Sequence, residues 1–187
     1  MIYEIRIHGR GGQGAKMAAE ILARAALLEG RFIQAFPEYG PERSGAPVVS
    51  YVRISSHHVA RERRGQPIKT HQPVISPQAV LVLDPTLLEA VEVVTGLKKN
   101  NFLIINSNVK CQMSNVKCYC IDASSIALKY IGKDKPNTVL LGVLAKVSGI
   151  VKLESLIKII KEIFEAKLGK EGVEANVKAV KEGYENF

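Results

Sequence analysis

The sequence predicts an α/β fold: a doubly wound, mostly parallel sheet flanked by helices. Strand and helix patterns alternate along the chain, and no internal repeat or low-complexity segment interrupts them. The run AVLVL at 79–83 is apolar throughout, which is typical of a strand buried on both faces of a parallel sheet. With 187 residues, 47% apolar and 24% charged, the chain is expected to form a single domain spanning 1–187.

The first predicted unit is a strand, a glycine-rich turn and a helix. Ile2, Ile5 and Ile7 begin the strand, which leads into the turn GRGGQG. Strong helix formers fill 15–29, and Gly30 is expected to end that helix.

Two strands and two irregular stretches follow. A strand is expected at 31–36, ended by Pro37, and a β-branched strand at 48–54. Between them PEYGPERSGAP, at 37–47, has neither a helical nor a strand period and is predicted to be a turn-rich loop. The polar stretch 55–77 is long for a compact domain, which favours a functional or interface loop.

The second half continues the α/β pattern. After the strand at 79–83, Asp84 and Pro85 are expected to start a helix over 85–95. Further strands are predicted at 102–106 and 116–122, and helices from near 124, at 138–148, 153–168 and 173–184. Apolar residues recur at three- and four-residue spacing in 153–168, which predicts an amphipathic helix covering a sheet.

Composition excludes several classes of protein. No apolar run reaches the length of a membrane span, and Glu4 and Arg6 interrupt the first apolar run, so we expect a cytoplasmic protein without membrane contact. The net charge of +8 favours anionic partners. The densest basic patch lacks the interleaved aromatic residues of a single-strand binding site, which argues against nucleic acid; it comprises Arg61, Arg63, Arg64 and Lys69.

The glycine turn carries the strongest chemical signal. Gly9, Gly11 and Gly14 satisfy G-x-G-x-x-G between a strand and a helix, where free N–H groups and the helix dipole attract a phosphate. Gly12 adds flexibility, and Gln13 adds an amide donor. The glycines have a second possible role, which is to let the helix pack closely on the strand.

An NAD site would need an acidic residue about 20 positions further on, to bind the ribose hydroxyls. That place holds Gln34, which weakens the dinucleotide interpretation. The loop at 37–47 should lie beside the glycine turn, because both follow strands at the carboxyl edge of the sheet. Its polar residues either contact a ligand or pair with each other or with another subunit; they include Glu38, Tyr39, Glu42, Arg43 and Ser44.

No catalytic residue or metal site is predicted. No nucleophile with an adjacent base is evident, and the four histidines show no metal-site spacing. His8 ends the first strand and either faces the ligand crevice or bonds to the backbone. Cys111, Cys118 and Cys120 match neither a disulfide framework nor zinc or ferredoxin-type spacing, so free thiols are expected.

Several ordered motifs together resemble the gamma subunit of the 2-oxoacid:ferredoxin oxidoreductases, pyruvate synthase above all. The motifs are GRGGQG at 9–14, FPEYGPERSGAPV at 36–48, VRIS at 52–55, VLDPTLL at 82–88, NTVLLG at 137–142 and EANVKAVKEGY at 174–184. The polar stretch 57–72 is longer than the corresponding link in that family, which favours a subunit contact as much as a ligand contact.

The resemblance implies a gamma-type domain of an enzyme that oxidatively decarboxylates a 2-oxoacid to its acyl-CoA and passes electrons to ferredoxin. In such enzymes the alpha and beta subunits hold thiamine diphosphate and Mg²⁺, and beta and delta parts hold iron–sulfur clusters. The gamma domain lies on the coenzyme A side and has no activity alone. The resemblance carries the coenzyme A contact onto Gly11, Gly12, Gln13 and Gly14, and onto Glu42, Arg43 and Ser44.

Other functions compete with this expectation. An indolepyruvate or 2-oxoglutarate enzyme of the same superfamily would carry similar motifs. A free-standing NAD(P)-dependent oxidoreductase would use the same glycine turn, and a nucleic-acid-binding module would use the basic charge.

Overall fold

A computed structural model describes residues 2–39, 45–58, 68–109 and 115–187 of the chain. The predicted basic residues Arg61, Arg63 and Arg64 lie outside these ranges. In chain order the elements are β1 (Ile2–Arg10), α1 (Ala15–Leu28), β2 (Arg31–Tyr39), β3 (Pro47–His58), β4 (Ala79–Val82), α2 (Leu87–Ala90), β5 (Phe102–Asn106), β6 (Lys117–Ile121), α3 (Ala123–Ile131), α4 (Asn137–Ser148) and α5 (Leu153–Glu185).

The six strands form one sheet in the order β2-β3-β1-β4-β5-β6. β3 runs antiparallel to both of its neighbours, β2 and β1. The pairs β1–β4, β4–β5 and β5–β6 are all parallel. The predicted α/β fold with a mostly parallel sheet flanked by helices is therefore confirmed.

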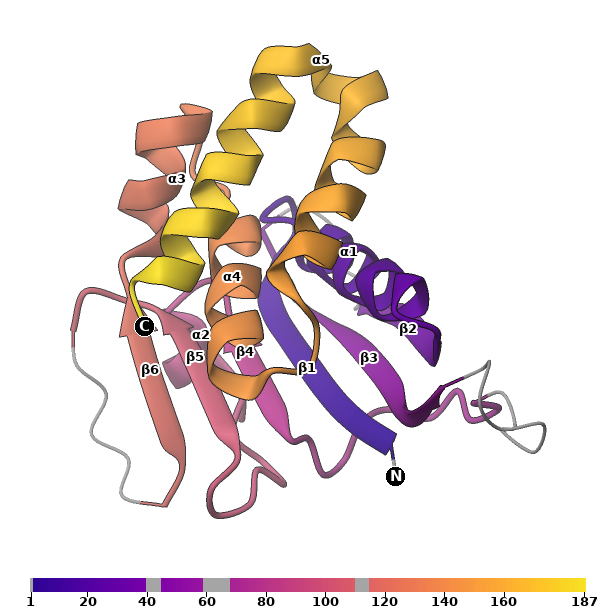
Figure 1. Cartoon of the computed structure of the whole chain (residues 1–187). Coiled ribbons are helices and arrows are strands. Elements are labelled where there is room, and N and C mark those ends of the chain that lie inside the picture. The colour runs from indigo at the N-terminus through magenta and orange to yellow at the C-terminus, as the bar shows by residue number, and fades with distance from the viewer. Residues whose placement is uncertain (1, 40–44, 59–67, 110–114) are drawn as a thin grey trace.

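The helices are unevenly divided between the two faces of the sheet. Four of them, α1, α3, α4 and α5, gather on one face, and the short α2 lies behind (Figure 1). Leu81 and Ile104 belong to the large core on the helix-rich face, whereas Val80 and Val82 join a smaller core with Leu87 on the other. Every residue of β4 is buried, as the apolar run at 79–83 predicts.

The C-terminal helix is bent into two arms. Gly169 has non-helical angles, with φ 65° and ψ −176°, and the chain turns back there (Figure 1). The two predicted helices at 153–168 and 173–184 correspond to these arms. α5 packs mainly on α1, α3 and α4. The apolar residues Leu156 and Ile160 of its first arm belong to the same core as Ile5 and other residues of the sheet.

Two predictions fail for identifiable reasons. β2 continues through Pro37 to Tyr39, because it is the edge strand, where a missing N–H costs no ladder hydrogen bond. The helix expected at 85–95 shrinks to the single turn of α2. Beyond it the chain leaves the helical path, and the carbonyl oxygens of Val93 and Thr95 accept hydrogen bonds from Arg6 at 2.8 and 2.6 Å.

Cys118 on β6 is disulfide-bonded, so the expectation of a free thiol is wrong for this residue. A disulfide depends on the distance between two side chains in the fold, which spacing along the chain does not reveal.

Candidate functional site

The candidate site lies at the edge of the sheet where its parallel strands end. β1 is followed by the glycine turn and α1, on the helix-rich face, while β4 is followed by α2 on the opposite face. β1 and β4 are neighbours, so their connections leave the sheet in opposite directions. In open α/β sheets, ligands bind in the crevice at such a switch point.

The glycine turn has the backbone geometry that its sequence predicts. Gly12 and Gly14 have φ of 98° and 92°, in the left-handed region that favours glycine. A Cβ on Gly14 would also lie 2.7 Å from Asn137 Nδ2. Gly14 caps α1 without a side-chain hydrogen bond to its first turn, which leaves a helix N-terminus suited to an anion.

The side chain of Gln13 is engaged within the turn. Its Oε1 accepts a hydrogen bond from the Arg10 backbone N–H at 2.7 Å, and its Nε2 donates to Asp84 Oδ2 at 2.9 Å. The amide therefore braces the turn against the end of β4. Its contact with a ligand, expected from the sequence, stays a prediction.

The carboxylate of Asp84 is contacted by donors from three residues, Gln13, Thr86 and Arg10. Besides Gln13, it accepts hydrogen bonds from the N–H of Thr86 at 3.0 Å and from its hydroxyl at 2.6 Å, and it pairs with Arg10 Nε at 3.2 Å. Burial alone would raise the pKa of Asp84, but the hydrogen bonds from Thr86 and Gln13 and the charge of Arg10 outweigh it and lower that pKa. The carboxylate is therefore ionised and held in place at neutral pH.

The last residues of the 37–47 loop, 45–47, which we call the return of the loop, contact the glycine turn. The Gly11 N–H donates to the Ala46 carbonyl at 2.9 Å, and the Gly45 N–H donates to the Gly11 carbonyl at 3.4 Å. These contacts confirm that the end of the loop lies beside the turn. The predicted site residues Glu42, Arg43 and Ser44 lie outside the described residues.

Two lysines on the segment between α3 and α4, which the sequence motifs do not mark, also lie at the turn. Lys135 Nζ donates to the Gly12 carbonyl, 123 residues away along the chain. Lys133 and Lys135 line a cavity of about 260 Å³ together with Gly12, Gly14 and Asn137. No local motif marks these lysines, because only the packing of α4 brings them to the turn.

A second cavity, of about 310 Å³, lies on the opposite face of the same edge, between β1, β3 and α2. His8, Glu38, Val49 and Leu87 are among its lining residues. Burial, reinforced by the charge of Arg6, lowers the pKa of His8 to about 4, so this imidazole is neutral at pH 7. His8 Nε2 is buried without a hydrogen-bond partner in the part of the chain that the structure describes.

Glu38, at the end of β2, bonds to the sheet. Its carboxylate accepts a hydrogen bond from the hydroxyl of Tyr51 on β3. Burial, together with this bond and the charge of Glu38, raises the pKa of Tyr51 to about 12. Glu38 is therefore bound to β3 through its side chain.

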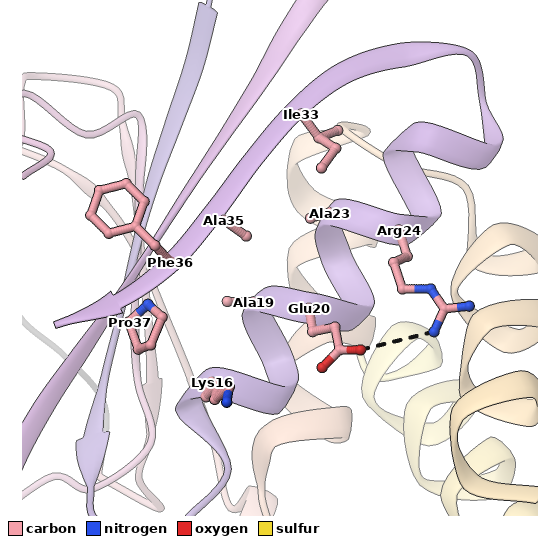
Figure 2. A pocket seen from close by; sticks show the side chains of 9 residues that line it. All are labelled: Lys16, Ala19, Glu20, Ala23, Arg24, Ile33, Ala35, Phe36 and Pro37. Atoms are coloured by element: carbon pink, nitrogen blue, oxygen red, sulfur yellow. Dashed lines mark ion pairs between the residues drawn. The ribbon is translucent and has the colours of Figure 1, made fainter. Parts of the chain in front are cut away.

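A third pocket lies between α1 and the edge strand β2 (Figure 2). Short alanine side chains on both elements leave a hollow of about 260 Å³, with Ala19, Ala23 and Ala35 among its lining residues. The ion pair between Arg24 and Glu20, with 3.9 Å between Nη1 and Oε1, lies at its rim. Gly11, Gly12, Gln13 and Gly14 do not line this pocket.

The sheet order disfavours the NAD(P) interpretation. In a dinucleotide-binding fold the strand that carries the ribose-binding acid lies next to the first strand. Here β3 lies between β1 and β2, so the end of β2 is one strand further from the glycine turn. Gln34, at the place expected for the acid, lies within β2, and its Oε1 accepts a hydrogen bond from Arg53 at 3.0 Å.

The described residues contain neither a cluster of metal-ligating side chains nor a membrane-spanning helix. No group of three or more His, Cys, Asp or Glu side chains is placed to hold a metal ion. None of the helices in the described ranges combines the length and apolar character needed to cross a membrane.

Known proteins resemble this chain in sequence over most of its length. The family model described as pyruvate ferredoxin/flavodoxin oxidoreductase matches residues 4–186. The chain is 46% identical over 172 residues to the pyruvate synthase subunit PorC of Methanothermobacter thermautotrophicus, spanning 92% of this chain and 91% of the relative. It is 43% identical over 189 residues to the common gamma subunit of the pyruvate/ketoisovalerate oxidoreductases of Pyrococcus furiosus, spanning 97% and 95%.

The fold agrees with a solved structure of the same kind. The crystal structure of the pyruvate oxidoreductase subunit PORC of Thermotoga maritima superposes with a TM-score of 0.82 at 39% identity, covering 98% of this chain and 96% of that one. The resemblance to the gamma subunit of the 2-oxoacid:ferredoxin oxidoreductases, stated from the ordered motifs, is thereby confirmed. The homologues of this chain are gamma subunits of such enzymes. The chain belongs to the pyruvate ferredoxin/flavodoxin oxidoreductase family.

Proposed function

We propose that this chain is the gamma subunit of a 2-oxoacid:ferredoxin oxidoreductase that acts on pyruvate, forms the acyl-CoA and passes electrons to ferredoxin. The observation that carries the proposal is the family match over 4–186, supported by relatives named as pyruvate synthase subunits. The relative in Pyrococcus furiosus is named as common to pyruvate and ketoisovalerate enzymes, which supports substrate choice by other subunits.

The chemistry in this proposal belongs to the partner subunits, named alpha, beta and delta. Thiamine diphosphate with Mg²⁺ would supply the decarboxylating centre, and iron–sulfur clusters would carry the electrons. This chain would act by shaping one wall of the shared site. The side chains at its glycine turn support that role, because Gln13, Asp84 and Thr86 bond to one another or to Arg10.

The wall formed by this chain would face coenzyme A. Its elements are Gly11, Gly12, Gln13 and Gly14 on the turn, with Glu42, Arg43 and Ser44 on the loop. The uncapped N-terminus of α1 and the lysines at 133 and 135 supply the positive potential that phosphates require. A charge-assisted hydrogen bond from Arg43 to a phosphate would contribute about 1.5–3 kcal/mol.

Purification of the native protein tests the subunit assignment. We expect it to co-migrate with chains that carry thiamine diphosphate and iron–sulfur clusters, and the assembled complex to reduce ferredoxin when given pyruvate and coenzyme A. Migration alone near the 20.5 kDa of this chain, without such partners, would contradict the proposal.

Replacement of one loop arginine tests the coenzyme A contact. In the complex, Arg43→Ala should raise the KM for coenzyme A by about tenfold or more, since the lost bond is worth at least about 1.5 kcal/mol. The KM for pyruvate should not change. Arg24→Ala is the matched control, because Arg24 pairs with Glu20 and Glu162 away from the turn. An unchanged coenzyme A dependence in Arg43→Ala would remove the contact from the proposal.

A further inference from the structure

The guanidinium of Arg10 joins three segments at the edge of the sheet. Arg10 is the last residue of β1 and the second residue of the glycine turn at 9–14. Its Nη1 donates to the Gly45 carbonyl at 3.1 Å, and its Nη2 donates to the Thr86 hydroxyl at 2.8 Å. Its Nε pairs with Asp84 Oδ2 at 3.2 Å. One side chain thus connects the end of β1, the return of the 37–47 loop and the segment after β4.

These contacts commit Arg10 to protein partners. Nη1 donates to Gly45, Nη2 and Nε both donate to the Thr86 hydroxyl, at 2.8 and 3.3 Å, and Nε also pairs with Asp84. A planar guanidinium can span these separated acceptors, whereas an ammonium is a compact point charge. Its side chain is 33% exposed and that of Asp84 only 14%. Arg10 is therefore a tether between separate segments of the chain.

The anchor of the tether, Asp84 and Thr86, is also held by hydrogen bonds that do not involve Arg10. The Thr86 N–H and hydroxyl both bond to Asp84 Oδ1, which leaves Oδ2 for Gln13 and Arg10. On the loop side, by contrast, the attachment to the turn is slight. The two backbone bonds there, from Gly11 to Ala46 and from Gly45 to Gly11, measure 2.9 and 3.4 Å.

We propose that Arg10 is a positioning residue, which holds the return of the 37–47 loop against the glycine turn by donating to Gly45 while Asp84 and Thr86 fix its guanidinium. The consequence for coenzyme A rests on the proposed function. If the loop carries a coenzyme A contact, loosening it weakens coenzyme A binding while the chemistry on partner-held cofactors continues.

Hydrogen exchange of the assembled complex tests the tether directly. In Arg10→Gln, the amides of Gly11 and Gly45 should exchange about tenfold faster than in the parent protein, because the loss of one charge-assisted bond favours local opening. Amides of the buried strand β4 should not change. Arg24→Gln is the matched control, since Arg24 has a similar exposed fraction of 42% and ion pairs remote from the turn. Unchanged exchange at Gly11 and Gly45 would overturn the inference.

Two conservative variants separate tethering from general loss of structure. Arg10→Lys keeps a charge for Asp84 but cannot reach all three acceptors, so it should give an intermediate rate of exchange. Asp84→Asn leaves Arg10 in place but removes the charge that fixes it, and should also speed exchange. If Arg10→Gln prevents assembly, these two variants provide the test, and parental exchange in both would refute the tether.

Kinetics of the same variants distinguish failure of the tether from failure of the proposed function. If both the tether and the proposed coenzyme A wall are correct, Arg10→Gln raises the KM for coenzyme A several-fold. The KM for pyruvate and the kcat then stay near their parent values. Faster exchange with an unchanged KM for coenzyme A would support the tether and contradict the coenzyme A wall. A changed KM with parental exchange at Gly11 and Gly45 would refute the tether.

Discussion

The crossing of α4 and the second arm of α5 should not tolerate one added methyl group. A Cβ on Gly142 would lie 2.1 Å from the Val180 carbonyl oxygen, and a Cβ on Gly183 would lie 2.2 Å from the Val139 carbonyl oxygen. Each helix therefore meets the backbone of the other at a glycine. Since ordinary contact begins at 3.4 Å, Gly142→Ala must separate the helices.

Two opposing effects determine how much Gly142→Ala changes the free energy of unfolding. In a helix with free space, glycine to alanine stabilises by about 1 kcal/mol. Overpacking of a well-filled interior costs about 1–3 kcal/mol, and the upper end applies because a backbone oxygen cannot rotate away. We therefore expect Gly142→Ala to lower the free energy of unfolding by about 2 kcal/mol, which lowers Tm by about 4–8 °C.

Urea and thermal unfolding of the purified chain measure this change. Glu165→Ala, at an exposed position on α5, is the control and should remain within about 0.5 kcal/mol of the parent. The double variant Gly142→Ala/Gly183→Ala should cost less than the sum of the single changes, because helices already separated accept the second methyl more easily. A neutral or stabilising Gly142→Ala would refute the close crossing.

Three further changes test the sheet and its helices. The pKa of His8 falls from 6.5 to about 4 on folding, so only the unfolded chain binds the proton between these values, and stability decreases as the pH drops through that range, by about 3 kcal/mol in total. His8→Gln should flatten this part of the pH dependence in urea unfolding, and an unchanged slope would contradict the buried neutral imidazole. Asp122 caps α3 by accepting from the Ser125 N–H at 3.0 Å, so Asp122→Ala should cost about 1 kcal/mol at pH 7, measured against Asp122→Asn, which can keep the bond. The hydrogen bonds from Ser125 lower the pKa of Asp122, so its contribution should be present above the usual carboxyl pKa and be lost as the pH falls through the lowered one. Arg53→Met should lower the free energy of unfolding by about 3 kcal/mol, because it leaves Glu4 without the partner it holds at 2.7 Å; a loss below 1 kcal/mol would show that the pair is dispensable.

Sequence patterns within short segments predicted those features that depend on the residues of the segment itself. The left-handed glycines at 12 and 14, the helix from Ala15 and the doubly buried strand at 79–82 agree with the structure, because backbone freedom, helix propensity and burial are properties of short segments. The non-helical angles at Gly169 divide α5 in the interval between the two helices predicted at 153–168 and 173–184.

Some local rules failed where distant residues act on a segment. Pro37 was expected to end β2, yet it continues the strand because the topology leaves β2 at the open edge. The helix expected beyond Asp84 stops after one turn, where carbonyls of Val93 and Thr95 instead bond to Arg6 on β1. In both cases the strand order, which no segment encodes alone, determined the outcome.

The sequence by itself therefore determined the α/β class, the glycine turn and the family, because ordered motifs and residue periodicity are written along the chain. Only the tertiary structure decided how that turn is built: the bracing of Gln13 by Asp84, the arrival of Lys135 at Gly12 and the tether from Arg10 to Gly45. These contacts join residues 35 to 123 positions apart, and their geometry depends on how the sheet and helices pack as a whole.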